Sequence, residues 1–270
     1  MPELPEVETV VRLLRPSLIN RTIFGIRCQW PRHIDRPDLS EFRRRITGSI
    51  VQDVTRRGKF ILISLDREET LIIHLRMSGH LAIVDKSLLV DKHSHTIFEL
   101  DNNQELRFRD TRKFGRVYLV HESQEVVGKL GPEPLDPQFT VEKLQEILSG
   151  RKRTLKPFLL DQSMIAGIGN IYADEALFHA RLHPERRTDS LTRNDITTLH
   201  TAIQDVLHQG IEREGASIST YTKPDGEKGD MQNAVQVFRR TGQSCYRCQS
   251  TIQRIIVGGR STHFCANCQK

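Results

Sequence analysis

The chain has 270 residues, long enough for one large domain or two ordinary ones that each bury a core. Its formal net charge is only +6, from 40 Lys and Arg against 34 Asp and Glu, so the placement of the basic residues carries more information than their excess. No apolar run approaches the roughly 20 residues that span a bilayer and no secretion signal begins the chain, which excludes integral membrane and secreted proteins and leads us to expect a soluble, cytoplasmic one.

The first predicted element is a helix from Pro5, with Val7, Val10 and Leu14 at helical spacing. Between residues 20 and 120, short apolar or alternating runs are separated by turn residues, which predicts a β-rich sandwich or barrel. The clearest of these runs are 60–65, 71–75, 96–100 and 116–120.

The segment 131–137 contains three prolines and a glycine and predicts a linker. From about 139 to 214 apolar residues recur at helical spacing, so the second domain is expected to be helical. Residues 215–229 are rich in glycine and polar groups, which favours a loop. The last thirty residues form a cysteine module.

Four of the five cysteines form two tight pairs, Cys245 with Cys248 and Cys265 with Cys268, separated by sixteen residues. This spacing is typical of a closed tetrahedral zinc site, and four thiolate ligands leave no open position, so one structural Zn²⁺ is expected. The alternative is a disulfide framework, which suits secreted proteins. Strands on either side of Gly258 and Gly259 would form a hairpin with Arg260 at its tip. Cys28 is expected to be a small buried hydrophobic residue.

Basic residues gather in five clusters, as expected of a surface that follows a phosphate backbone. Solvated surface charge is the alternative interpretation. The clusters are Arg43 to Arg45, Arg56 to Lys59, Arg107 to Arg116, Arg151 to Arg153, and Arg239 with Arg240.

The N-terminus itself is a candidate nucleophile. Removal of Met1 would expose the secondary amine of Pro2 just before a helix. An α-amino group has a reference pKa of about 7.7 to 8.0, and nearby cations would lower it and leave a useful neutral fraction. Glu3 and Glu6 lie beside it as candidate acid and base groups, although acidic residues there are also common helix caps.

Several strings, in this order, cover the chain from end to end: MPELPEVETV, RRGKF, HLRMSG, RDTRKFGR, LGPEPL, LLDQSMIAGIGNIYADEALF and the four-cysteine hairpin. Together they resemble the formamidopyrimidine-DNA glycosylase family. The resemblance implies an α+β multidomain protein with a catalytic β-sandwich domain flanked by helices (1–130), a linker (131–137), a helix-two-turn-helix domain with a lesion-recognition loop at 215–229 (138–229), and a zinc-finger hairpin (230–270). It also implies a monomer that acts on double-stranded DNA.

The implied activity is base-excision repair: removal of oxidised purines, followed by cleavage of the strand. By similarity, Pro2 attacks the sugar C1′ and forms an imine, and Glu3 acts as acid toward the sugar ring oxygen. Lys59 matches the lysine assigned to β-elimination. Arg260 matches the finger arginine linked to phosphate contact and δ-elimination, and Glu6 matches a family carboxylate.

The resemblance also implies DNA-contacting residues. A glycosylase takes its base out of the stack, and the hole that remains needs filling. Phe114 would wedge into the stack and Arg112 would address the orphaned base, with Met77 as the third member of this void-filling set. Without the family, Met77 and Phe114 would more often be core residues. The other implied contacts are Asn170, His74, His93, Arg151 and Lys156.

Four positions depart from the common pattern: Ser78, Arg239, Ser261 and Ala266. Ser78 and the 215–229 loop lie in regions tied to base recognition, so the lesion preference is the part of the function that they affect. Two rival interpretations remain. The endonuclease VIII branch prefers oxidised pyrimidines, but it usually has glycine where this chain has Leu4. A zinc-hairpin protein that only binds DNA would explain the basic clusters without chemistry.

Overall fold

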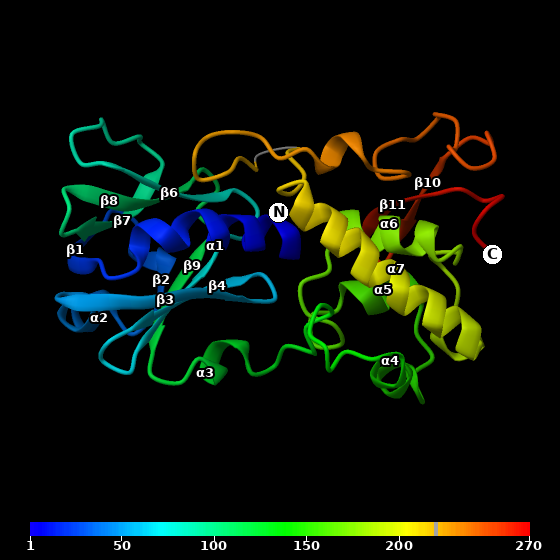
Figure 1. Ribbon diagram of the computed structural model, residues 1–270, viewed down its shortest axis with the longest axis horizontal. Coiled ribbons are helices and arrows are strands. Elements are labelled where there is room, and N and C mark those ends of the chain that lie inside the picture. The colour runs from blue at the N-terminus through cyan, green and yellow to red at the C-terminus, as the bar shows by residue number, and fades with distance from the viewer. Residues whose placement is uncertain (219–220) are drawn as a thin grey trace. The chain divides into compact units, whose positions relative to one another are not determined.

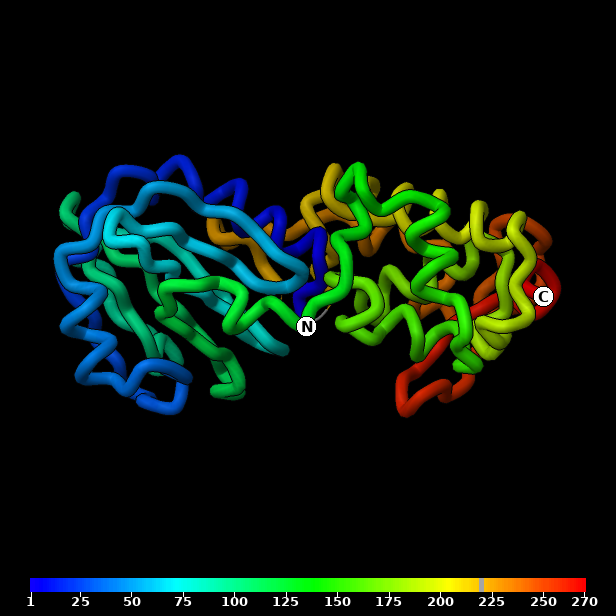
Figure 2. Tube along the Cα trace, turned by 90° about the horizontal axis from the view of Figure 1, so that it is seen from below, coloured from blue at the N-terminus to red at the C-terminus, as the bar shows by residue number. Residues whose placement is uncertain are grey.

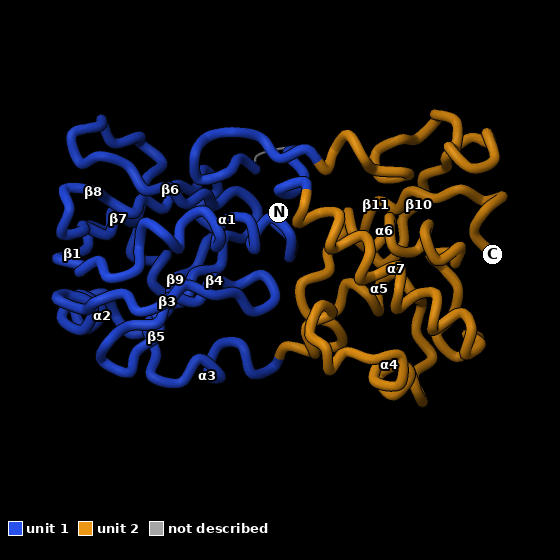
Figure 3. The backbone as a smooth tube through the Cα atoms, in the orientation of Figure 1, with its two compact units in different colours: residues 1–129, 213–230 blue, residues 130–212, 231–270 orange. Residues whose placement is uncertain are grey.

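The computed structural model describes residues 1–218 and 221–270, which divide into two compact units (Figure 3). Unit 1 contains Met1–Lys129 and Arg213–Asp230, and unit 2 contains Leu130–Glu212 and Met231–Lys270. The described part of the predicted loop 215–229 therefore groups with the N-terminal residues, and residues 219–220 of that loop lie outside the described residues. The division by role into 1–130, 131–137, 138–229 and 230–270 stays a prediction.

Unit 1 is built on a nine-stranded sheet with the order β2-β9-β5-β4-β3-β1-β7-β8-β6. Neighbouring strands are antiparallel except for β2 and β9, which are parallel. The strands are β1 (Thr22–Cys28), β2 (Ile34–Arg36), β3 (Ser49–Arg57), β4 (Phe60–Leu65), β5 (Thr70–His74), β6 (Gly79–Asp85), β7 (Ser94–Leu100), β8 (Gln104–Asp110) and β9 (Arg116–Val120).

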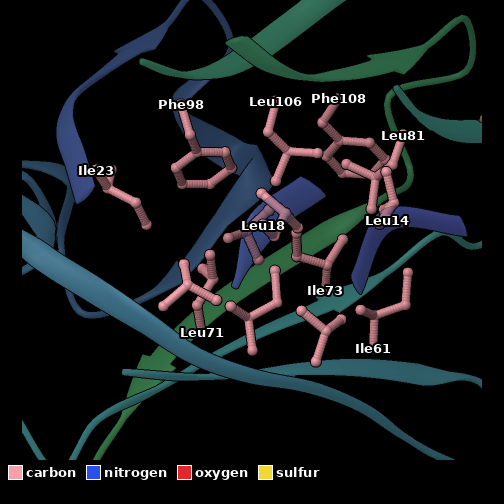
Figure 4. Packing of buried hydrophobic residues seen from close by; sticks show 14 of the residues in the cluster. Leu14, Leu18, Ile23, Ile61, Leu71, Ile73, Leu81, Phe98, Leu106 and Phe108 are labelled. Carbon is pink, nitrogen blue, oxygen red and sulfur yellow. The ribbon is translucent and has the colours of Figure 1, made fainter. Parts of the chain in front are cut away.

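The two halves of this sheet enclose the core of unit 1, with helix α1 (Leu4–Leu18) between them (Figure 1). Leu14 and Leu18 from α1 lie between side chains of β4 and β5 and side chains of β7 and β8 (Figure 4). The apolar residues of α1 recur every three or four positions and so point to one stripe of the helix. Burying this stripe on both halves makes the sheet a sandwich, which confirms the predicted fold class.

Three short helices complete unit 1: η1 (Pro31–His33), α2 (Leu39–Ile46) and α3 (Gln124–Val127). The Asp38 carboxylate caps α2 by accepting hydrogen bonds from the backbone N–H groups of Ser40 and Glu41. Phe42 and Ile46 of α2 are buried in the core of unit 1. This helix was not among the elements expected from the sequence.

Unit 2 is helical with a β-hairpin, as expected. Its elements are α4 (Val141–Leu148), α5 (Leu155–Leu160), α6 (Asn170–His179), η2 (Thr188–Ser190), α7 (Arg193–Glu212), η3 (Met231–Asn233), β10 (Gln253–Val257) and β11 (Arg260–Phe264). The turn between β10 and β11 projects from the rest of its unit (Figure 2, red). None of the helices in the described part of the chain is both long and apolar enough to cross a membrane.

Candidate DNA-repair site

The residues just ahead of α1 are buried, although Met1 itself is exposed. Pro2 and Glu3 are buried, and Glu3 and Glu6 form a reciprocal capping box. The backbone N–H of Glu3 donates to Glu6 Oε2 at 2.8 Å, and the N–H of Ala216 donates to Glu6 Oε1 at 2.8 Å. Glu6 therefore ties the first residues of the chain to the segment at 216, which explains why that segment belongs to unit 1.

Charged groups surround the chain's first amine. Burial lowers the pKa of the Met1 amine below its ordinary value; Glu3 and Glu6 oppose this shift, and Lys59 and Arg112 add to it. The structure thus brings Lys59 and Arg112, which are distant from the N-terminus in the sequence, close to the start of the chain. A lowered pKa leaves more of an amine neutral at physiological pH, which is what a nucleophile needs.

Lys59 follows Gly58 in the tight turn between β3 and β4, where Arg57 pairs with Phe60. Gly58 has a φ of +55°, a backbone conformation that favours glycine. The Lys59 side chain is buried, so its position is set by the turn and its surroundings. A lysine confined in this way keeps its amine close to the chain start, where its charge lowers the pKa of the Met1 amine.

Met77, Arg112 and Phe114 lie on two neighbouring loops of unit 1. Met77 lies between β5 and β6, and the other two lie between β8 and β9. The Arg112 guanidinium donates to the Met77 sulfur at 3.4 Å and lies 5.0 Å from the centre of the Phe114 ring. Phe114 is 45% exposed, and Arg112 is exposed as well. These side chains form an assembled, solvent-facing set, as the void-filling role requires.

The buried Asp110 carboxylate is hydrogen-bonded to both loops, the one that contains Met77 and the one that contains Arg112 and Phe114. It accepts from the Ser78 hydroxyl (2.5 Å) and from the backbone N–H groups of Arg112 (3.2 Å) and Gly115 (2.7 Å). Burial would raise the pKa of Asp110, but the neighbouring His33 ring, with Nε2 at 3.6 Å, and the hydrogen bonds from Ser78, Gly115 and Arg112 outweigh it and hold the pKa below the ordinary value. Asp110 therefore stays ionised, and a charged acceptor holds its donors more strongly than a neutral one.

Glycines let the two loops pack on a single ring. A Cβ on Gly115 would lie 2.3 Å from Cζ of Phe108, and one on Gly79 would lie 2.7 Å from Cε2 of the same ring. Any larger residue would push one of the loops outward. Gly79 and Gly115 thus allow the two loops to pack closely against the Phe108 ring.

His74 is buried at the end of β5, and its Nδ1 accepts a hydrogen bond from the Arg76 N–H at 3.0 Å. Burial, together with the charges of Arg76 and Lys59, lowers the pKa of His74 to about 3. Its ring is therefore neutral at physiological pH with the proton on Nε2, and it can donate one hydrogen bond without adding charge. His93 is half-buried, 6.2 Å from the His95 ring.

In unit 2, Asn170 and Arg260 lie on elements joined by a hydrogen bond. Asn170 begins α6 after a tight turn, and its Nδ2 donates to the carbonyl oxygen of Ser261 at 3.0 Å. Arg260 is exposed and begins β11, paired with Val257 across the hairpin turn. Both turn glycines have positive φ, as a two-residue hairpin turn of this type requires.

Two predicted DNA contacts have intramolecular partners in unit 2. The Lys156 side chain is fully buried, and its amine donates to Asp174 and to the Ser261 carbonyl. Arg151 donates to the Ile147 carbonyl at 2.6 Å near the C-terminal end of α4. Their DNA-contacting roles stay predictions.

The four paired cysteines converge on one point in unit 2. Their sulfur atoms all lie within 4.8 Å of one another, with Cys245 and Cys268 at 3.9 Å and Cys248 and Cys265 at 3.5 Å. A tetrahedral zinc with bonds of about 2.3 Å to sulfur separates its ligands by about 3.8 Å. The thiols are free, so the zinc prediction fits and the disulfide alternative does not. Cys28, expected to be buried, is only partly buried, against the core of unit 1.

Comparison with known proteins covers the whole chain. Residues 1–117 match the formamidopyrimidine-DNA glycosylase N-terminal domain, residues 130–222 its H2TH domain, and residues 242–270 the zinc finger found in FPG and IleRS. Formamidopyrimidine-DNA glycosylase of Herpetosiphon aurantiacus is 45% identical over all of both chains, and that of Chloroflexus aurantiacus is 46% identical over 100% of this chain and 98% of its own.

The solved structures agree with these relatives. Lactococcus lactis Fpg in complex with DNA containing an abasic site is 37% identical over 99% of both chains, with a TM-score of 0.93. A variant of the same protein in complex with DNA containing Fapy-dG has a TM-score of 0.94 and 37% identity over 100% of both chains. The chain belongs to the formamidopyrimidine-DNA glycosylase family.

Family membership confirms the predicted enzyme class, a DNA glycosylase that also acts as a lyase at abasic sites, and the structural zinc of the finger. The full-length relatives are formamidopyrimidine-DNA glycosylases, and they support neither the endonuclease VIII interpretation nor the interpretation of a protein that only binds DNA. The structure adds residues that the sequence analysis missed, above all Asp110 and Asp174. A carboxylate inside the apolar run of α6 was a usable signal for Asp174, whereas Asp110 ends an ordinary alternating strand.

Proposed function

We propose that this glycosylase removes oxidised purines, 8-oxoguanine and formamidopyrimidines, from duplex DNA through the amine of Pro2. The amine forms a bond to C1′ of the damaged nucleotide as the bond from C1′ to the base breaks, and the base leaves with a proton. Glu3 protonates the sugar ring oxygen, which opens the ring and leaves an imine. The observation that carries this proposal is the position of Pro2, buried beside Glu3 just ahead of α1, where the charges of Lys59 and Arg112 act on the adjoining Met1 amine.

Strand cleavage follows from the same imine. Loss of a proton from C2′ breaks the bond from C3′ to its phosphate oxygen, with Lys59 as the proposed base of this β-elimination. Arg260 holds a phosphate and assists the δ-elimination, in which C4′ loses a proton and the bond from C5′ to its phosphate oxygen breaks. Water then hydrolyses the imine and regenerates the free amine. The sequence is redox-neutral, and no step requires the zinc.

DNA binding is assigned to exposed and hydrogen-bonding groups on both units. Met77, Arg112 and Phe114 would fill the space left by the extruded base, and their mutual contacts support that assignment. Asn170, Arg260 and the neutral His74 would bind phosphates, and His93 and Arg151 would add further contacts. The segment 215–229 would contribute to base recognition through its described residues, and the proposed form is a cytoplasmic monomer.

A trapping experiment tests the nucleophile. The protein is incubated with duplex DNA containing 8-oxoguanine opposite cytosine, and borohydride is added to reduce the imine to a stable adduct. Wild-type protein should form the adduct only after Met1 is removed, because a retained methionine places the Pro2 nitrogen in an amide. Pro2→Gly and a chain with residues added ahead of Pro2 should lose trapping and keep their DNA affinity. Undiminished trapping by the extended chain would refute Pro2 as the nucleophile.

A parallel duplex with an oxidised pyrimidine tests the substrate class. Faster excision of the purine lesion supports the proposal, and faster excision of the pyrimidine favours the specificity of the endonuclease VIII branch. Binding of both duplexes with neither adduct nor cleavage, after confirmed removal of Met1, would leave only a DNA-binding role.

A further inference from the structure

A buried ionic cluster in unit 2 joins two helices to the hairpin strand that begins with Arg260. Lys156 comes from α5, Asp174 from α6 and His263 from β11, and the side chains of Lys156 and Asp174 are 0% exposed. Asp174 Oδ1 accepts from the Lys156 amine at 2.5 Å. Its Oδ2 accepts from the backbone N–H of His263 at 2.9 Å and lies 3.0 Å from Nδ1 of the same residue.

The cluster also fixes the backbone directly after Arg260. The Ser261 carbonyl accepts from the Lys156 amine and from Asn170 Nδ2, each at 3.0 Å. The hairpin turn itself lies against α5, because a Cβ on Gly258 would be 2.7 Å from Cγ of Pro157. Three contacts from α5 and α6 therefore converge within a few residues of Arg260.

The zinc is too far from the hairpin turn to fix the position of Arg260. Five residue steps of extended strand separate Arg260 from Cys265, and at about 3.3 Å per residue they span about 16 Å. The metal fixes the base of the hairpin, whereas the tip depends on a second anchor. The buried cluster lies at the right position to be that anchor.

A buried ammonium also has little freedom to reach DNA. Removing one partner of a buried ion pair leaves an uncompensated charge in a medium that solvates it poorly. Lys156 would have to leave Asp174 and the Ser261 carbonyl to touch a phosphate. The charge of Lys156 thus interacts with groups inside unit 2.

We propose that Lys156 and Asp174 are positioning residues, which hold Arg260 and Asn170 in place for a DNA phosphate without touching the DNA themselves. The inference rests on the proposed phosphate-binding roles of Arg260 and Asn170. It assigns Asp174 a function and replaces the direct DNA contact expected of Lys156.

Direct phosphate binding by Lys156 and positioning of Arg260 by the ion pair predict opposite changes in DNA affinity for Asp174→Leu. If Lys156 bound a phosphate directly, removal of the neighbouring negative charge in Asp174→Leu would free the lysine and tighten DNA binding. If the pair positions Arg260, the same change weakens binding. Lys156→Met weakens binding in both cases, so Asp174 is the decisive position.

The experiment measures the dissociation constant of the full-length, zinc-loaded protein for a duplex with a tetrahydrofuran abasic-site analogue, over a range of salt concentrations. We expect Lys156→Met and Asp174→Leu each to weaken binding by roughly ten-fold, about 1.4 kcal/mol. The double variant should bind no worse than either single variant, since residues of one network are not additive. Adding Arg260→Ala to any of them should cost little more.

The salt dependence gives an independent readout. Loss of a direct phosphate contact lowers the slope of log K against log salt by about one. We expect equal slopes for Lys156→Met and Asp174→Leu. A lower slope for Lys156→Met alone, or tighter binding by Asp174→Leu, would overturn the inference. Lys143→Met removes a solvent-facing lysine of the same unit that lies outside the five basic clusters, and it serves as the matched control for loss of one charge.

Zinc content and thermal melting report whether each variant folds. Should Asp174→Leu lose its zinc, His263→Gln replaces it, because this change removes one side-chain contact to Asp174 without leaving a buried charge unpaired. We then expect a two- to three-fold weakening, and wild-type affinity would overturn the inference. A wild-type protein that fails to bind the abasic duplex would instead refute the proposed function, so the two failures are distinguishable.

Discussion

Asp110→Asn should loosen the two loops that bear Met77, Arg112 and Phe114. The side chain of Asp110 is 0% exposed, and its carboxylate accepts from one hydroxyl and two backbone N–H groups. Asparagine keeps one acceptor oxygen. Its NH₂ group replaces the other oxygen and cannot accept the hydrogen bonds that this oxygen accepted. One lost bond to a charged group costs about 1.5 to 3 kcal/mol, and an unsatisfied buried donor costs about 1 to 3 kcal/mol.

We therefore expect a loss of about 3 kcal/mol in the free energy of unfolding of unit 1. At about 2 to 4 °C per kcal/mol this corresponds to a fall of roughly 6 to 12 °C in Tm. The chain's single tryptophan, Trp30, lies in unit 1, so urea titration followed by its fluorescence reports on the right unit. Asp53→Asn is the matched control, because the pair it forms with Arg15 is largely exposed and is worth at most about 1 kcal/mol.

The pH dependence follows from the lowered pKa of Asp110. A carboxyl whose folded pKa lies below its unfolded value stabilises the fold above the unfolded value, about 3.9, and loses this contribution as pH falls toward the folded pKa. The difference between wild type and Asp110→Asn should be constant from pH 7 to about 5 and shrink below about 4. The reasoning would be refuted if the difference in free energy of unfolding were as large at pH 3.5 as at pH 7. It would also be refuted if Asp110→Asn were as stable as wild type at pH 7.

Three further outcomes follow from the structure. The pKa of His74 is lowered to about 3, so wild type should lose stability as pH falls below about 6.5, and His74→Gln should lose less over the same range in urea titrations. Phe114→Ala should change the free energy of unfolding by less than about 0.5 kcal/mol, since the ring is exposed, yet lower kcat/KM on lesion duplex roughly ten-fold or more, and unchanged kinetics would contradict the wedge role. Cys248→Ala should abolish zinc binding and weaken DNA binding while leaving the fluorescence-detected unfolding of unit 1 unchanged, which atomic absorption and urea titration check together.

The sequence predicted the elements whose signals are local. The apolar spacing after Pro5 predicted α1, alternating runs predicted β4 and β9 with the bounds that the structure shows, and the cysteine spacing predicted the zinc site. The cysteine prediction held because four thiolates at short spacing have few alternative uses. Catalytic candidates such as Lys59 came from family resemblance, since a lysine in a tight turn is ordinary by itself.

What the sequence could not reveal depends on contacts between distant residues. Lys156 reads as a surface lysine near a basic cluster, and only its pairing with Asp174, eighteen residues away, makes it a buried one. Likewise, nothing local shows that the segment at 216 returns to the first unit, because that return depends on the bond from Ala216 to Glu6 across 210 positions. Local patterns record the propensity of a segment and not the partner that finally buries it.

Asp110 and Asp174 perform the same physical task in separate units. Each is a buried carboxylate that accepts backbone N–H groups from a segment bearing exposed side chains proposed to bind DNA. An exposed side chain gains little from packing, so its position must be set by the backbone beneath it, and a charged acceptor fixes that backbone more strongly than a neutral one. Changes in lesion preference are expected at the exposed positions, and weaker DNA binding is expected when either carboxylate is replaced.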